Sequence, residues 1–179
     1  MRAKWTLALV VCLALVVPAG AVAAAPVGTG RADTAVAYYY SDGTGCLIMT
    51  LSEGIYRPVG KDAWSYGQSL VVQLAPSCEN YAEGAVDLDS SSYRIFGLTA
   101  AYVVAEIDVG GQSVSVDVAW VATGTPKLTT EGLADHPEWS FVGKDVAAHL
   151  SGTVLVDGEP WTADQTNAIL RSFSIAKNF

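Results

Sequence analysis

Apolar residues recur at every second position through most of this chain, and this period constrains its fold more than any other feature. The apolar runs are short, rich in β-branched and aromatic residues, and separated by Gly, Pro, Asp, Asn and Ser. A period of two is typical of strands with one buried face, so we predict an all-β fold. The expected strands cover 34–40, 46–52, 69–75, 83–89, 93–109 (one bent strand or two), 112–123, 139–142, 146–156 and 169–176.

One hairpin can be predicted with its register. Gly110 and Gly111 form a two-residue loop that tolerates the positive φ angles of a type I′ or II′ turn, which places Val109 opposite Gln112. In this register one face is apolar and the other mostly polar, and a slip of one residue would destroy that match. The residues expected on the apolar face are Ala101, Val103, Ala105 and Ile107, opposite Trp120, Val118, Val116 and Val114.

A sheet with one apolar face must bury that face, and the sequence offers at most one short helix to cover it. We therefore expect an antiparallel two-layer β-sandwich of about eight or nine strands, with a closed β-barrel as the alternative. The one helix candidate is near the C-terminus, where Thr162 and Gln165 form a capping-box pattern. An extended segment over 169–175 is the competing interpretation.

Residues 1–25 resemble a secretory signal peptide. Arg2 and Lys4 precede an apolar run from Leu7 to Val17, and Pro18 and small residues follow. The run is shorter than the roughly 20 residues that span a bilayer, although a retained N-terminal anchor is the alternative. We expect a secreted protein whose residues 26–179 form a single domain.

Two cysteines, Cys46 and Cys78, remain outside the signal peptide. An oxidising extracellular compartment favours a disulfide between them, because neither lies in a metal-binding motif or beside a histidine. In the chain-entropy model a loop of about 33 residues gains roughly 3–4 kcal/mol from such a bridge.

The charge of the chain argues against two classes of partner. Ten cations face 18 acidic residues, and the signal peptide holds two of the cations. Nucleic acids and anionic membranes are bound mainly through cations, so we expect neither as a partner.

No established catalytic, nucleotide-binding or metal-binding motif occurs in residues 26–179, so we assign no catalytic residue, metal or cofactor. His136 lies in a polar stretch and His149 in an expected strand. Asp87 and Asp89 offer oxygen ligands but lack the remainder of a calcium loop, and we interpret the segment as a turn.

Aromatic residues give the best functional lead. Tyr56, Trp64 and Tyr66 crowd a polar, Gly-containing stretch, where exposed rings would suit binding to a sugar or a protein. The alternative is ordinary packing of a loop over the end of the fold.

Two hypotheses about function follow. The first is a non-enzymatic secreted β-domain that binds an extracellular protein or glycan, or acts structurally outside the cell. The second is a small secreted hydrolase whose site combines dispersed carboxylates or His136. The chain resembles no family that would decide between them.

Overall fold

The computed structural model describes residues 28–41, 45–60, 64–133, 136–161 and 165–177. Every regular element in these ranges is a β-strand, and none of the described residues belongs to a helix that could cross a membrane. The signal-peptide candidate, residues 1–25, lies outside them. The strands are β1 Gly28–Ser41, β2 Gly45–Pro58, β3 Trp64–Ala75, β4 Ala82–Asp87, β5 Tyr93–Ile95, β6 Ala100–Val109, β7 Gln112–Ala122, β8 Lys127–Leu133, β9 His136–Val156, β10 Glu159–Pro160 and β11 Gln165–Lys177.

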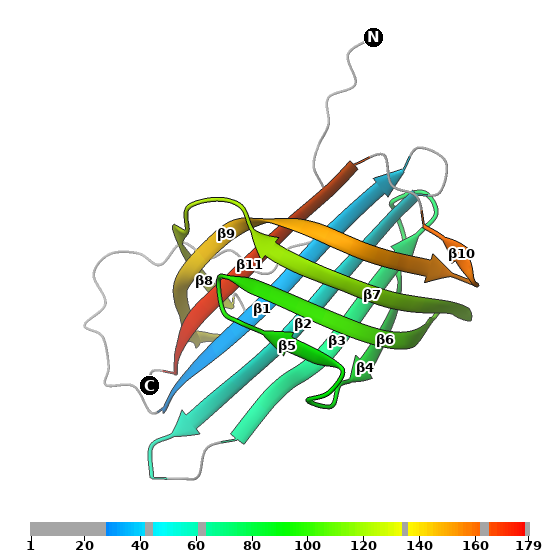
Figure 1. Cartoon of the computed structure of the whole chain (residues 1–179). Coiled ribbons are helices and arrows are strands. Elements are labelled where there is room, and N and C mark those ends of the chain that lie inside the picture. Colours follow the sequence, from blue (N-terminus) through cyan, green and yellow to red (C-terminus); the bar gives the residue numbers. More distant parts are fainter. Residues whose placement is uncertain (1–27, 42–44, 61–63, 134–135, 162–164, 178–179) are drawn as a thin grey trace.

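All strands belong to one antiparallel sheet, which confirms the predicted all-β class. The main path runs β4-β3-β2-β1-β11-β9-β7-β6-β5, while β8 and β10 both pair with β9. The sheet curls into a half-barrel (Figure 1). Its two ends approach each other, because β4 contacts β6 across the opening.

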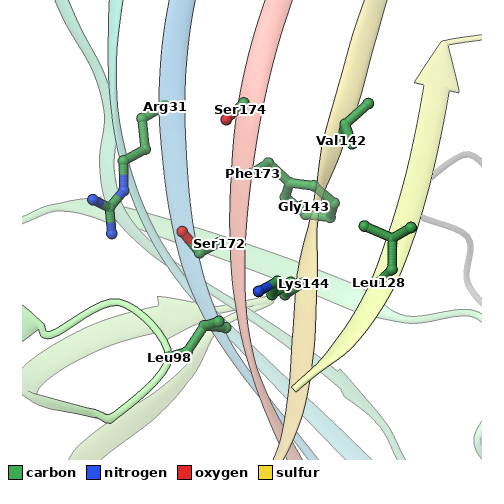
Figure 2. Close-up of a pocket in the computed structure, with 9 residues that line it drawn as sticks. All are labelled: Arg31, Leu98, Leu128, Val142, Gly143, Lys144, Ser172, Phe173 and Ser174. Carbon is green, nitrogen blue, oxygen red and sulfur yellow. The ribbon is translucent and has the colours of Figure 1, made fainter.

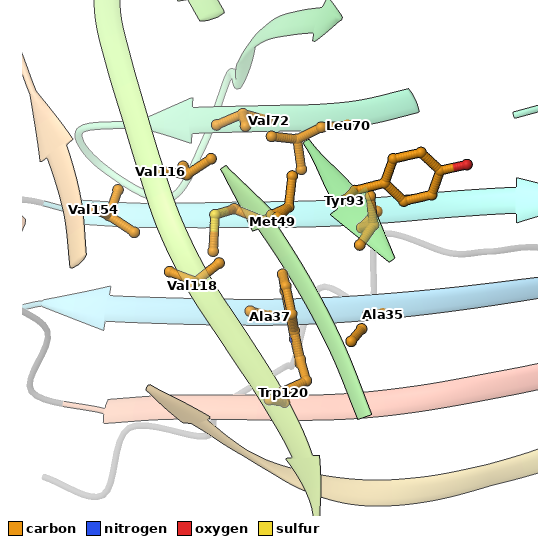
Figure 3. Packing of buried hydrophobic residues seen from close by; sticks show 14 of the residues in the cluster. Ala35, Ala37, Met49, Leu70, Val72, Tyr93, Val116, Val118, Trp120 and Val154 are labelled. Carbon is orange, nitrogen blue, oxygen red and sulfur yellow. The ribbon is translucent and has the colours of Figure 1, made fainter. Parts of the chain in front are cut away.

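The hydrophobic core fills one half of the concave side. Side chains from β1, β2 and β3 meet those of β6 and β7 there (Figure 3). Trp120 is fully buried, and its indole N–H donates a hydrogen bond of 3.1 Å to the carbonyl oxygen of Val36. This bond satisfies the ring nitrogen inside the core. Other fully buried core residues are Leu47, Met49, Leu51, Leu70, Val72, Val103, Val114 and Leu170.

Two detailed predictions are confirmed. The hairpin of β6 and β7 has the expected register, with Val109 opposite Gln112 and Val103 opposite Val118. Cys46 and Cys78 form a disulfide with Cα atoms 4.8 Å apart. The bridge ties the start of β2 to the turn between β3 and β4.

Other expectations need correction. β8 and β10 were not expected, and the strands expected at 139–142 and 146–156 are parts of the single strand β9. Residues 165–177 form β11, so the extended interpretation holds there, whereas Thr162 lies outside the described residues. β9 can be this long because it changes neighbours: 139–148 pair with β11, and 148–156 pair with β7.

Candidate functional site

The concave face continues beyond the hydrophobic core as an open groove. Its larger part is a cavity of about 440 Å³, a size suited to a small molecule. Figure 2 shows its lining side chains, drawn from β1, β8, β9, β11 and the turn before β6. The lining consists of Arg31, Leu98, Leu128, Val142, Gly143, Lys144, Ser172, Phe173 and Ser174.

Strand register explains why these residues share one face. Lys144 of β9 is the cross-strand partner of both Leu128 and Ser172, and Ser172 is the partner of Asp33. Asp33 in turn pairs with Glu53 of β2. Directly paired residues point to the same side of a sheet, so these five form one row across the floor of the groove.

A second row runs beside the first. Val142 is opposite Ser174, Ser174 is opposite Arg31, and Arg31 is opposite Ile55. Val142 and Ile55 are exposed although they are large and apolar. The two rows therefore combine apolar surface with serine hydroxyls and charged groups, which is the usual make-up of a small-molecule site.

Arg31 occupies the centre of the groove. Its Nε lies 2.9 Å from Oδ2 of Asp33, and its Nη2 lies 3.2 Å from Oδ1, so the two side chains form a bidentate ion pair. Asp33 is only 8% exposed, whereas the Arg31 side chain is 63% exposed. The guanidinium also reaches the turn before β6, where a Cβ on Gly97 would lie 3.0 Å from Nη2. The pair holds Arg31 in the groove with one side open to solvent.

Lys144 is the second cation of the larger cavity. No ion-pair partner for its ammonium group occurs among the described residues, and the described lining contains no carboxylate. The chain as a whole has an excess of acidic residues. The larger cavity is thus a local positive site on an acidic protein.

The groove continues on the other side of Arg31 as a smaller cavity of about 170 Å³. Its lining comprises Arg31, Asp33, Glu53, Gly54, Ile55 and Gln68. The hydroxyl group of Tyr93, on β5, lies near the carboxylate of Glu53. Burial raises the pKa of Tyr93, and the nearby carboxylate of Glu53 raises it further. The Tyr93 hydroxyl group therefore stays neutral at physiological pH.

Of the predicted aromatic site residues, Tyr56 belongs to neither cavity lining. Tyr56 is 5% exposed, and its ring packs against Trp139 with the centroids 5.0 Å apart. The backbones of Trp64 and Tyr66 belong to β3, opposite Tyr56 and Gly54, but their side chains lie outside the described part. Ligand binding by these three rings stays a prediction.

The other polar candidates take ordinary positions. His149 is exposed on β9, and only the backbone of His136 is described. Oδ1 of Asp89 accepts hydrogen bonds from the backbone N–H groups of Ser91 and Ser92, at 2.8 and 3.1 Å, as in a turn. Within the described ranges, no three His, Cys, Asp or Glu residues are grouped to hold a metal ion.

The sequence analysis did not identify the groove residues. A change in which face of a strand carries the apolar residues could have revealed them. In β11, Ala168 and Leu170 are buried at even positions, but further along Phe173 and Ile175 are buried at odd positions while Ser172 and Ser174 line the groove. The apolar alternation therefore shifts by one residue where the core ends.

Comparisons with known proteins give no family. No protein-family model and no curated protein sequence matches the chain. One similar solved structure is the enduracididine biosynthesis enzyme MppR, complexed with the condensation product of pyruvate and imidazole 4-carboxaldehyde, with TM-score 0.31, 8% identity, and coverage of 86% of this chain and 87% of that one. Another is an acetoacetate decarboxylase-like enzyme from Sphingomonas wittichii RW1, with TM-score 0.34, 7% identity, and coverage of 85% and 92%.

These comparisons correct the first functional hypothesis. Both similar structures are enzymes, which contradicts the expected non-enzymatic module for protein or glycan binding. At these TM-scores the likeness assigns no reaction, substrate or residue role to this chain.

Proposed function

We propose that the protein binds a small organic anion in the groove, with the charged group of the ligand at Lys144 and its apolar part against Leu98, Leu128 and Val142. The observation that carries this proposal is Lys144, a cation with no ion-pair partner among the described residues, in a cavity whose described lining has no carboxylate. Ser172 and Ser174 add hydroxyl groups that can donate hydrogen bonds to an anion.

Titration calorimetry with octanoate at pH 7 and low salt tests the proposal. We expect the wild-type protein to bind octanoate, and Lys144→Gln to weaken binding about tenfold or more, as befits the loss of a charge-assisted hydrogen bond. The matched control is Lys127→Gln. Lys127 is the neighbour of Leu128 along β8 and pairs with Asp145, so it lies on the opposite face of the sheet.

Removal of either lysine changes the net charge equally, so a general electrostatic effect would weaken binding equally in both variants. Equal affinities of the two variants, or no binding of octanoate by the wild-type protein, would contradict the proposal.

The hydrolase hypothesis also concerns this groove. Asp33 and Glu53 are dispersed in the sequence but directly paired across β1 and β2, so the fold does bring two carboxylates together. Asp33 forms an ion pair with Arg31, and Glu53 lies near the Tyr93 hydroxyl group. Hydrolysis by dispersed carboxylates or His136 stays a prediction.

For the architecture and location we propose a partly open barrel in a secreted protein. The barrel is favoured over the sandwich because all described strands belong to one sheet and β4 contacts β6 across the opening. The Cys46–Cys78 disulfide is compatible with an extracellular location. We also propose that residues 1–25 are a signal peptide that is removed by cleavage.

A further inference from the structure

We infer that the ligand of the groove is a zwitterion of the size of a short peptide, with its carboxylate at Lys144 and a protonated amine at Glu53. This inference rests on the proposed function and extends it to the smaller cavity. It follows from the distribution of charge along the row of residues on the groove floor.

Four charged side chains of the described residues line the groove, and two of them neutralise each other. Arg31 and Asp33 form the bidentate ion pair. This leaves the positive charge of Lys144 in the larger cavity and the negative charge of Glu53 in the smaller one. The other polar groups in the two linings, Ser172, Ser174 and Gln68, are uncharged. The groove therefore has a positive end and a negative end, with a neutral pair between them.

Glu53 is prepared to accept an ammonium group. The described residues place no cation in an ion pair with it, and the nearby Tyr93 hydroxyl is neutral. A carboxylate has about four acceptor sites, so Glu53 can accept hydrogen bonds from an ammonium group. The side chain amide of Gln68 lines the same cavity and offers one further acceptor oxygen.

The separation of the two charges sets the length of the ligand. Lys144, Ser172, Asp33 and Glu53 follow one another in register on β9, β11, β1 and β2. Adjacent strands lie about 4.8 Å apart, so the backbones at the two ends are roughly 14 Å apart. Both side chains extend into a concave face, which shortens the gap between their charged groups. An α-amino acid is too short to reach both, whereas an extended peptide of two or three residues, at about 3.4 Å per residue, has the right scale.

A series of straight-chain ligands measures this geometry. We compare each ω-amino acid from 4-aminobutanoate to 8-aminooctanoate with the alkanoate of the same carbon number, by titration calorimetry at pH 7. We expect the amino form to bind at least tenfold more tightly at one chain length, because only that length places the ammonium group at Glu53. Triglycine should then bind at least tenfold more tightly than N-acetyl-triglycine.

Substitutions at Glu53 decide where the amine binds. Glu53→Gln should remove the gain from the amino group, because the side chain loses its negative charge, and should leave alkanoate affinity within about twofold. Glu53→Asp should move the optimum to a ligand one carbon longer, because the carboxylate is withdrawn by one methylene. Glu106→Gln is the control, since Glu106 is an exposed residue of β6 outside both linings.

The outcomes separate the two proposals. If alkanoates bind in a Lys144-dependent manner but no amino form binds more tightly, the groove takes simple anions and the zwitterion is wrong. If the amino form still binds more tightly than the alkanoate in Glu53→Gln, the inference is also wrong, because the amine then binds elsewhere. If no alkanoate binds, or Lys144→Gln has no effect, the proposed function itself fails.

Discussion

At the scale of single residues, Tyr39 shows how burial at the edge of the core changes the pKa of a side chain. Tyr39 lies on β1 with its side chain packed against the hydrophobic core. Burial raises the pKa of its hydroxyl group to about 12, because the phenolate would lose its hydration. The group is therefore neutral at any physiological pH and acts as an apolar ring with a polar tip.

This shift predicts a loss of stability at high pH. Below about pH 10 the hydroxyl is protonated in the folded and unfolded states alike, so it adds no pH dependence. Between about pH 10 and 12 the unfolded state loses the proton first, so the free energy of unfolding falls as pH rises. Guanidinium unfolding at pH 9, 10.5 and 11.5 should show a shallower decline for Tyr39→Phe than for the wild-type protein.

Tyr81 and Tyr93 also have raised pKa values, so the variant should retain some alkaline dependence. The informative quantity is the difference in the free energy of unfolding between the wild-type protein and Tyr39→Phe at each pH. Parallel curves from pH 9 to 11.5 would mean that Tyr39 ionises equally easily in the folded and unfolded states.

At the scale of elements, the hairpin of β6 and β7 is the part that sequence reasoning predicted in full. Its turn and its apolar alternation pointed to the same register, and either alone would have been weaker. Two parts that the sequence analysis missed, β8 and the start of β1, line the groove. β8 presents Leu128 and Thr130 to the concave side, and the start of β1 presents Arg31 and Asp33. A strand that carries polar residues on its inner face lacks the alternation that identifies a strand.

The two faces of this hairpin should respond differently to charge. Val118 is buried in the core, and its neighbour Asp117 is exposed. Val118→Asp should cost several kcal/mol, because an unpaired carboxylate would be buried, and should abolish the cooperative melting transition. Asp117→Asn should change the melting temperature by no more than a few degrees. Similar melting curves for both variants would show that the assigned faces are wrong.

At the scale of the whole molecule, the half-barrel depends on a close approach between its two ends. Gly84 of β4 is buried against β6, and a Cβ at this position would overlap the carbonyl oxygen of Asp108. The charged residues of the groove can be read from the sequence, but the sequence does not show that they lie together in the fold. Their proximity results from pairing among β9, β11, β1 and β2. Asp33 and Ser172, for example, are partners although they are 139 positions apart in the sequence, and pairings this distant leave no local sequence signal.

A methyl group at Gly84 should therefore force the two ends apart. We expect Gly84→Ala to lower the free energy of unfolding by about 1–3 kcal/mol, as overpacking of a tight contact does. Gly124→Ala is the control, because the nearest atom to its added Cβ, the Cβ of Ala147, is at an ordinary 3.7 Å. Chemical denaturation followed by circular dichroism measures both, and a Gly84→Ala variant as stable as the control would refute close packing of β4 on β6.

The pairing of β1 with β11 also determines the order in which this molecule can be assembled. Thirteen positions of β1 have their partners on the last described strand, so one full edge of β1 cannot be completed until that strand has been synthesised. A ribosome releases the chain from its N-terminal end, and until then β1 can complete only its other edge, with β2. The floor of the groove, to which β1 and β11 both contribute, is thus among the last parts of the protein to form.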